Sequence, residues 1–131
     1  MQKLKLDELN RVSVAEFKAQ EKLPVVVVLD NVRSMHNVGS IFRTGDGFSI
    51  EKVILCGITA RPPHREIEKT ALGATQSVDW VHFEDTNMAI SSLRNLGYEI
   101  IAIEQAAYST MLNTFTPTTD KKYALIFGNE V

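Results

Sequence analysis

The segment Asn31–Phe48 carries the densest group of side chains that could do chemistry. It follows an apolar run, and it contains Asn37, Gly39 and Arg43. Asparagine commonly begins a helix, so we expect one to start near Asn37, and a glycine lets another backbone or a ligand come close. An arginine guanidinium can hold a phosphate with two hydrogen bonds or polarise a hydroxyl group. A capped helix with a surface arginine explains the same residues equally well, so both interpretations stay open.

Several apolar runs of the chain end at polar or glycine-containing residues, and these ends are Asp30-Asn31, Cys56-Gly57, Glu104-Gln105 and Gly128-Asn129-Glu130. In parallel α/β sheets, ligands bind outside the C-terminal ends of the strands. These residues are therefore candidates for one binding crevice, although each of them is also compatible with an ordinary turn.

Other kinds of site find little support. His36, His64 and His82 are far apart, and no Cys, His and Asp residues have the spacing of metal ligands, so we predict no metal site. The chain contains neither a G-x-G-x-x-G nor a Walker A sequence, which argues against a dinucleotide or P-loop site. Cys56 ends an apolar run and is interpreted as a core residue rather than a nucleophile.

The elements that must position these residues alternate between strands and helices. Apolar runs predict strands at Val25–Leu29, Lys52–Cys56, Val78–Phe83, Tyr98–Glu104 and Tyr123–Phe127. Helices are predicted at Val38–Phe48, at Arg65–Leu72 with Gly73 as the C-cap, and from Asp85 to Gly97. This alternation predicts an α/β fold with a mostly parallel sheet and flanking helices. An N-terminal helical segment is expected over residues 1–23, where Ser13 and Glu16 have the spacing of a capping box.

The composition of the 131-residue chain is that of about one globular domain. No apolar run is long enough to cross a bilayer, so we expect no membrane partner. The single cysteine suits a reducing cytoplasm. The net charge of −2 is unlike that of a protein that coats nucleic acid. Basic residues could still form a local surface that attracts anions, and they are Arg33, Arg43, Arg61, Arg65 and Lys69.

The stretch Asp30–Thr44 resembles the first motif of the SpoU (TrmH-type) RNA 2′-O-ribose methyltransferases, of the SPOUT superfamily. In that motif an Asn is followed by Gly, by Arg and then by Ser or Thr, and the matching residues here are Asn37, Gly39, Arg43 and Thr44. Gly128-Asn129-Glu130 is similar to the opening of the second motif. The segments Leu9–Pro24 and Pro63–Trp80 also resemble the family, so the resemblance covers nearly the whole chain. It implies that residues 24–131 are an incomplete SPOUT methyltransferase domain.

The resemblance implies that S-adenosylmethionine donates a methyl group to a ribose 2′-hydroxyl of tRNA or rRNA. Arg43 would activate that hydroxyl. A guanidinium, with a pKa above about 12, does this more easily by orienting an RNA phosphate that takes the proton than by acting as the base itself. Asn37 would position Arg43 or the substrate, and Glu130 would hold the active-site network. The implied cofactor contacts are Ile103, Glu104 and Gly128, and the implied RNA contacts are Arg33, His36, Arg43, Arg65 and Lys69.

Members of the resembled family continue past the second motif into a third, which threads a knot, closes the cofactor pocket and builds much of a dimer interface. This chain ends at Val131, inside the second motif. We therefore expect a C-terminally truncated chain, a Rossmann-like part of the α/β knot domain that is inactive or weakened. The complete protein is expected to be a cytoplasmic homodimer. A non-catalytic RNA-binding or assembly module on the same sheet stays an alternative, and a flavodoxin-like nucleotide-binding domain is a less favoured one.

Overall fold

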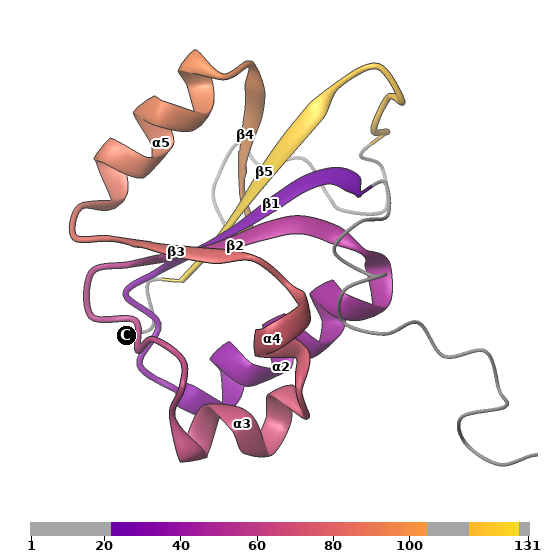
Figure 1. Cartoon of the computed structure of the whole chain (residues 1–131). Coiled ribbons are helices and arrows are strands. Elements are labelled where there is room, and N and C mark those ends of the chain that lie inside the picture. Colours follow the sequence, from indigo (N-terminus) through magenta and orange to yellow (C-terminus); the bar gives the residue numbers. More distant parts are fainter. Residues whose placement is uncertain (1–21, 105–115, 129–131) are drawn as a thin grey trace, which may run out of the picture.

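The computed structural model describes residues 22–104 and 116–128, and its framework is a sheet whose strands all run parallel (Figure 1). The strands are β1 (Leu23–Asp30), β2 (Ile50–Cys56), β3 (Trp80–Phe83), β4 (Tyr98–Ala102) and β5 (Lys122–Gly128). Their order across the sheet is β3-β2-β1-β5-β4. The predicted α/β fold with a mostly parallel sheet is confirmed, and within the described residues the sheet is parallel throughout.

Helices cover both faces of the sheet, as Figure 1 shows. One face carries α2 (Met35–Phe48), α3 (Arg65–Ala71) and α4 (Ala74–Ser77), and the other carries α5 (Thr86–Asn95). In the central strand β1, Val27 and Leu29 pack in the core under α2, while Val26 and Val28 pack in the core under α5. A strand that is buried on both faces needs apolar residues at every position, which explains why this run shows no alternation.

The path of the chain through the sheet reverses beside β1. From β1 it moves outward through β2 to the edge strand β3, then crosses to the opposite edge at β4, and returns to β5 next to β1. The C-terminal ends of β1 and β5 therefore lie together, since Asp30 pairs with Gly128 in the parallel register. Such a reversal is the place where ligands bind in open α/β sheets.

The helix that carries the first motif begins three residues earlier than predicted. Ser34 is its N-cap, and the Ser34 hydroxyl accepts a hydrogen bond of 3.1 Å from the backbone nitrogen of Asn37. The predicted N-cap role of Asn37 is therefore wrong, because a serine upstream already caps the helix. As a consequence His36, which precedes the predicted start of the helix, lies in the first turn of α2 beside Asn37.

Other predicted ends are also corrected. Leu72, with a φ of 50°, is the C-cap of α3 in place of Gly73, and Gly73 is instead the N-cap of the short helix α4, which was not predicted. Because α4 occupies the residues before it, β3 starts at Trp80 and not at Val78. The strand β4 ends at Ala102, two residues before the predicted end. The predicted N-terminal helical segment lies almost entirely outside the described residues, so the proposed division into residues 1–23 and 24–131 stays a prediction.

Candidate functional site

A cleft of about 820 Å³, here called the strand-end cleft, opens at the C-terminal ends of the strands where the chain reverses. Its walls come from the ends of β1, β4 and β5 and from the start of α5. The predicted cofactor contacts Ile103, Glu104 and Gly128 all lie on these walls, and so do Asp30 and Asn31. The structure thus brings together residues from strand ends that lie far apart in the sequence, as the predicted crevice required. Cys56 and Gly57 do not line the cleft.

Asp30 lines the strand-end cleft at the end of β1, and two neighbouring side chains hold its carboxylate in place. The Thr86 hydroxyl donates a hydrogen bond of 2.5 Å to Asp30 Oδ1, and Asn31 Nδ2 lies 3.3 Å from the same oxygen. Gly128 has a φ of 112°, and a Cβ atom on it would overlap the carbonyl oxygen of Asp30 and lie 3.3 Å from its nitrogen. Glycine is therefore needed here for two reasons, the left-handed backbone and the close approach of β5 to the end of β1.

The lining of the cleft combines carboxylates with apolar side chains. Its acidic residues are Asp30, Glu84, Asp85 and Glu104, its large apolar residues are Ile90, Ile103 and Ile126, and none of its lining residues within 22–104 and 116–128 is basic. A positively charged group is favoured beside carboxylates, and a flat apolar ring is favoured between isoleucines. The cleft therefore suits a ligand that carries both.

The loop between β1 and α2 is fixed by buried hydrogen bonds. The hydroxyl of Thr59, which is 2% exposed, donates to the carbonyl oxygen of Leu29 at 3.1 Å and accepts from the backbone nitrogen of Val32 at 3.0 Å. Asn31 adopts a left-handed φ of 50°, and its Oδ1 accepts from the backbone nitrogen of Ile58 at 3.0 Å. Sequence reasoning missed Thr59 and Thr86, because their partners lie 27 or more positions away.

The two candidate catalytic residues on α2 differ in their surroundings. Asn37 lines a smaller hollow of about 340 Å³ between α2 and the strands, here called the α2 hollow, together with Thr44, Phe127 and Gly128. Gly128 lines both hollows, so the α2 hollow adjoins the strand-end cleft at the end of β5. Arg43 is exposed on α2 and lines neither hollow. The third candidate, Glu130, lies outside the described residues.

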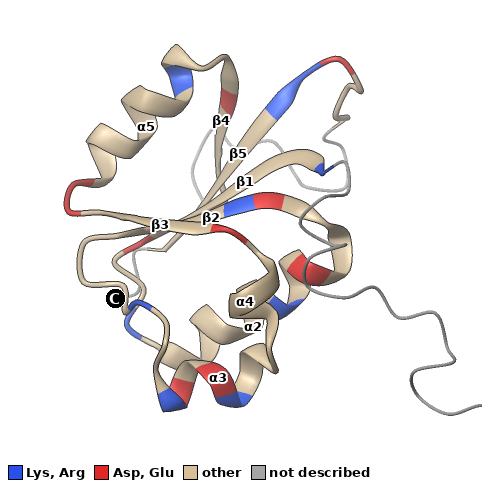
Figure 2. Cartoon of the chain, viewed as in Figure 1, with Lys and Arg blue, Asp and Glu red and all other residues tan. Residues whose placement is uncertain are grey.

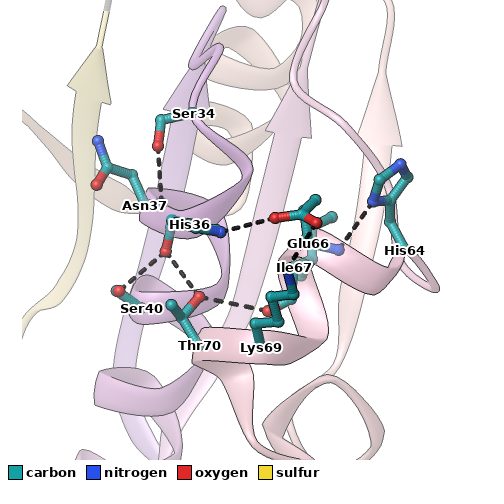
Figure 3. A network of polar contacts seen from close by, with 9 residues as sticks. All are labelled: Ser34, His36, Asn37, Ser40, His64, Glu66, Ile67, Lys69 and Thr70. Carbon is teal, nitrogen blue, oxygen red and sulfur yellow. Dashed lines mark hydrogen bonds and ion pairs between the residues drawn. The ribbon is translucent and has the colours of Figure 1, made fainter.

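The predicted RNA contacts are all exposed on the side of the molecule that carries α2 and α3. Figure 2 shows that basic and acidic residues are interleaved there, with both kinds on α3. The carboxylate of Glu66 lies between two of the predicted contacts, 2.9 Å from His36 Nε2 and 2.9 Å from Lys69 Nζ (Figure 3). The hydrogen bonds from Lys69 and then from His36 hold the pKa of Glu66 below its usual value. The sequence analysis did not foresee this acidic residue among the basic ones.

Cys56 is fully buried, and the predicted core role is confirmed. Burial is the main cause that raises the pKa of its thiol to about 11. Over residues 22–104 and 116–128, no three His, Cys, Asp or Glu side chains come together as metal ligands would. Over the same ranges, no helix has the length and apolar character needed to cross a membrane.

The model of the SpoU rRNA methylase family matches residues 24–131, which is most of this chain. The chain belongs to the SpoU rRNA methylase family. The resemblance found in the first motif is thereby confirmed. Among SpoU relatives, a Staphylococcus saprophyticus protein named for the TrmH family of tRNA/rRNA methyltransferases is 33% identical over 91 residues, which cover 70% of this chain and 36% of that protein.

Two further methyltransferases are similar to this chain. The 23S rRNA (guanosine-2′-O-)-methyltransferase RlmB of Neisseria meningitidis is 24% identical over 107 residues, which cover 82% of this chain and 42% of that protein. The crystal structure of an AdoMet-bound rRNA methyltransferase from Sinorhizobium meliloti has a TM-score of 0.74 at 28% identity and matches 84% of this chain and 41% of its own. This chain thus spans less than half the length of these three proteins.

Proposed function

We propose that the protein methylates a ribose 2′-hydroxyl in tRNA or rRNA with S-adenosylmethionine as the methyl donor. The main structural support for this proposal is that Gly128 lines both the strand-end cleft and the α2 hollow. A donor in the cleft and a nucleotide beside α2 would meet across the end of β5. Membership of the SpoU family and the named activities of the relatives support the same chemistry.

The residues of the strand-end cleft fit S-adenosylmethionine. Its volume of about 820 Å³ lies in the range of small-molecule sites, which is roughly 300–1,000 Å³. Ile90, Ile103 and Ile126 offer apolar surface for the adenine ring, and the carboxylates of Asp30 and Glu104 suit a positive charge. When bound, the cofactor supplies a methyl group on a positively charged sulfur. Because Gly128 has no side chain, the backbone of β5 lies directly against the end of β1 on the wall of the cleft.

Arg43 and Asn37 act on the substrate side in this proposal. The 2′-hydroxyl is a poor nucleophile until its proton is drawn off. A guanidinium stays protonated at neutral pH, so Arg43 holds the adjacent RNA phosphate with two hydrogen bonds, and that phosphate accepts the proton. Asn37 positions Arg43 or the ribose from the first turn of α2. Glu130, carried over from the family's second motif, holds the network around them.

The basic residues around α2 and α3 are proposed to hold the RNA backbone, and they are Arg33, His36, Arg65 and Lys69. The charges of the two arginines and Lys69, together with the ring nitrogens of His36, supply contacts to phosphates that do not depend on the base sequence. The proposal further includes a cytoplasmic location and a homodimer as the working form.

The test is transfer of a labelled methyl group from S-adenosylmethionine to tRNA and to rRNA by the protein that carries this chain, followed by digestion of the RNA to nucleosides. The expected product is a 2′-O-methyl nucleoside, and a base-methylated nucleoside would contradict the proposed acceptor. The cofactor site is tested separately by calorimetric titration. Gly128→Ala should weaken S-adenosylmethionine binding about tenfold or more through overlap with Asp30. The control Gly97→Ala brings the same left-handed strain at a φ of 89° and should leave binding unchanged.

A further inference from the structure

Glu66 occupies the space between two side chains that could hold an anion. Its Oε2 lies 2.9 Å from His36 Nε2 on α2, and its Oε1 lies 2.9 Å from Lys69 Nζ on α3 (Figure 3). All three side chains are exposed to solvent, with 40% of the Glu66 side chain accessible. Solvent-exposed ion pairs of this kind contribute little to stability, on the order of 0–1 kcal/mol. The carboxylate can therefore leave this place at small cost to the fold.

The backbone that carries His36 is fixed without Glu66. The carbonyl oxygen of His36 accepts hydrogen bonds from the Thr70 hydroxyl at 2.8 Å and from the Ser40 hydroxyl at 2.9 Å (Figure 3). Thr70 comes from α3, so this bond ties the first turn of α2 to the helix that carries Lys69. The absence of a side chain on Gly39 lets α3 pack at this distance. The backbone positions of His36 and Lys69 therefore persist when the Glu66 carboxylate moves away.

We propose that His36 and Lys69 form a contact for a backbone phosphate of the RNA, and that Glu66 holds this place until the phosphate displaces it. A carboxylate and a phosphodiester each present two acceptor oxygens on one central atom, so two donors spaced for the first also suit the second. The first turn of α2 carries no acidic residue, and Arg65 lies next to Glu66 in the sequence. Glu66 is therefore the acidic residue that a phosphate at this point would meet first.

Glu66 has two effects on RNA in this arrangement. It keeps the His36 and Lys69 side chains in place in the free protein, and its negative charge repels the incoming phosphate. Glu66→Gln keeps the size of the side chain and removes the charge. RNA should then bind about fivefold more tightly, as expected when one like charge is removed from near a phosphate in water. The acidic residue thus acts as a competitor that limits binding to RNA.

The experiment measures the affinity of the chain for a fluorescently labelled oligouridylate by anisotropy over a series of salt concentrations. The matched control is Glu68→Gln, which removes the same charge from the same helix. Glu68 Oε1 accepts a hydrogen bond of 2.7 Å from Thr75, away from His36 and Lys69. Thermal unfolding of each variant confirms that it is folded. The proposal predicts a gain for Glu66→Gln that Glu68→Gln lacks, and no gain when Lys69→Ala is combined with Glu66→Gln.

Lys69→Ala alone should weaken binding and reduce the slope of log affinity against log salt by about one, as for one lost phosphate contact. Equal gains from Glu66→Gln and Glu68→Gln would overturn the inference, because they would show only a general effect of charge. No gain from Glu66→Gln would overturn it as well. The inference rests on RNA being the substrate, but this binding assay needs neither cofactor nor methyl transfer. Its failure is therefore distinguishable from failure of the proposed activity.

Discussion

Gly39 of α2 lies directly against the backbone of Ala71 in α3. A Cβ atom on Gly39 would come within 2.9 Å of the Ala71 nitrogen and would overlap the Ile67 carbonyl oxygen and the Thr70 hydroxyl. The glycine of the first motif therefore serves the packing of α3 on α2. Through this packing it sets where Lys69 lies relative to His36.

Gly39→Ala is expected to lower the free energy of unfolding by about 1–3 kcal/mol or more, because overpacked sites force the backbone to shift. The measurement is urea unfolding followed by circular dichroism. Gly47→Ala is the matched control on the same helix, since a Cβ atom there meets nothing within 4 Å. That control should stabilise the protein by about 0.5–1 kcal/mol, as alanine does in helices. Equal effects of the two substitutions would contradict the packing role of Gly39.

Thr59→Val should destabilise the protein by about 1–3 kcal/mol, because the buried polar groups of Leu29 and Val32 lose their shared partner. Valine keeps the shape of threonine, so the effect reports the hydroxyl. Thr59→Ser keeps the hydroxyl and is expected to recover most of the loss. The same urea unfolding series measures both variants. If serine were as damaging as valine, the methyl group and not the hydrogen bonds would be what matters at this position.

Burial raises the pKa of Cys56 to about 11 from 9.0, which makes its thiol unreactive in the folded protein. At pH 8 only about one thiol in a thousand is then ionised, and iodoacetamide should modify Cys56 far more slowly than it modifies the unfolded chain. Because the folded state keeps its proton up to a higher pH than the unfolded state does, stability should fall as pH rises from 9.0 towards about 11. Mass spectrometry follows the modification.

The stability effect of Cys56 is isolated with Cys56→Ala, which should lose the part of the alkaline fall in stability that the thiol causes. Chemical unfolding of both proteins at several pH values between 8 and about 11 provides the comparison. Rapid modification of the native protein at pH 8 would show that the thiol is accessible, against its complete burial at the end of β2.

Much of the fold could be predicted from the sequence because burial leaves a pattern in it. A strand covered on both faces must be apolar throughout, and Val25–Leu29 shows this plainly. The start of α5 was also predictable, since the Asp85 side chain accepts from the backbone nitrogen of Asn87 at 2.8 Å as a cap should. The first turn of α2 was harder, because Ser34 and Asn37 are both good caps and only the folded backbone distinguishes them.

The candidate site was predictable only in part. Parallel strands end together, so Glu104 and Gly128 could be named in advance as residues of one crevice, and the family resemblance added Ile103. The contacts that stabilise the site could not be predicted, because they join residues that are distant in the chain. Thr86 reaches Asp30 over 56 positions, and His36 reaches Glu66 over 30. No local pattern marks either pair, and only the packing of α5 and α3 creates them.

The most direct test of the proposed function is the rate of methyl transfer by the Arg43→Ala variant. The labelled-methyl assay is run on the protein that carries this chain, with Arg94→Ala on the opposite face as the control for loss of one exposed arginine. Arg43→Ala is expected to lower the rate of 2′-O-methylation about 100-fold or more, as when proton transfer is lost. S-adenosylmethionine affinity should stay unchanged, and Arg94→Ala should keep full activity. RNA methylation by Arg43→Ala at the wild-type rate would show that Arg43 is not catalytic and would favour a non-catalytic RNA-binding module.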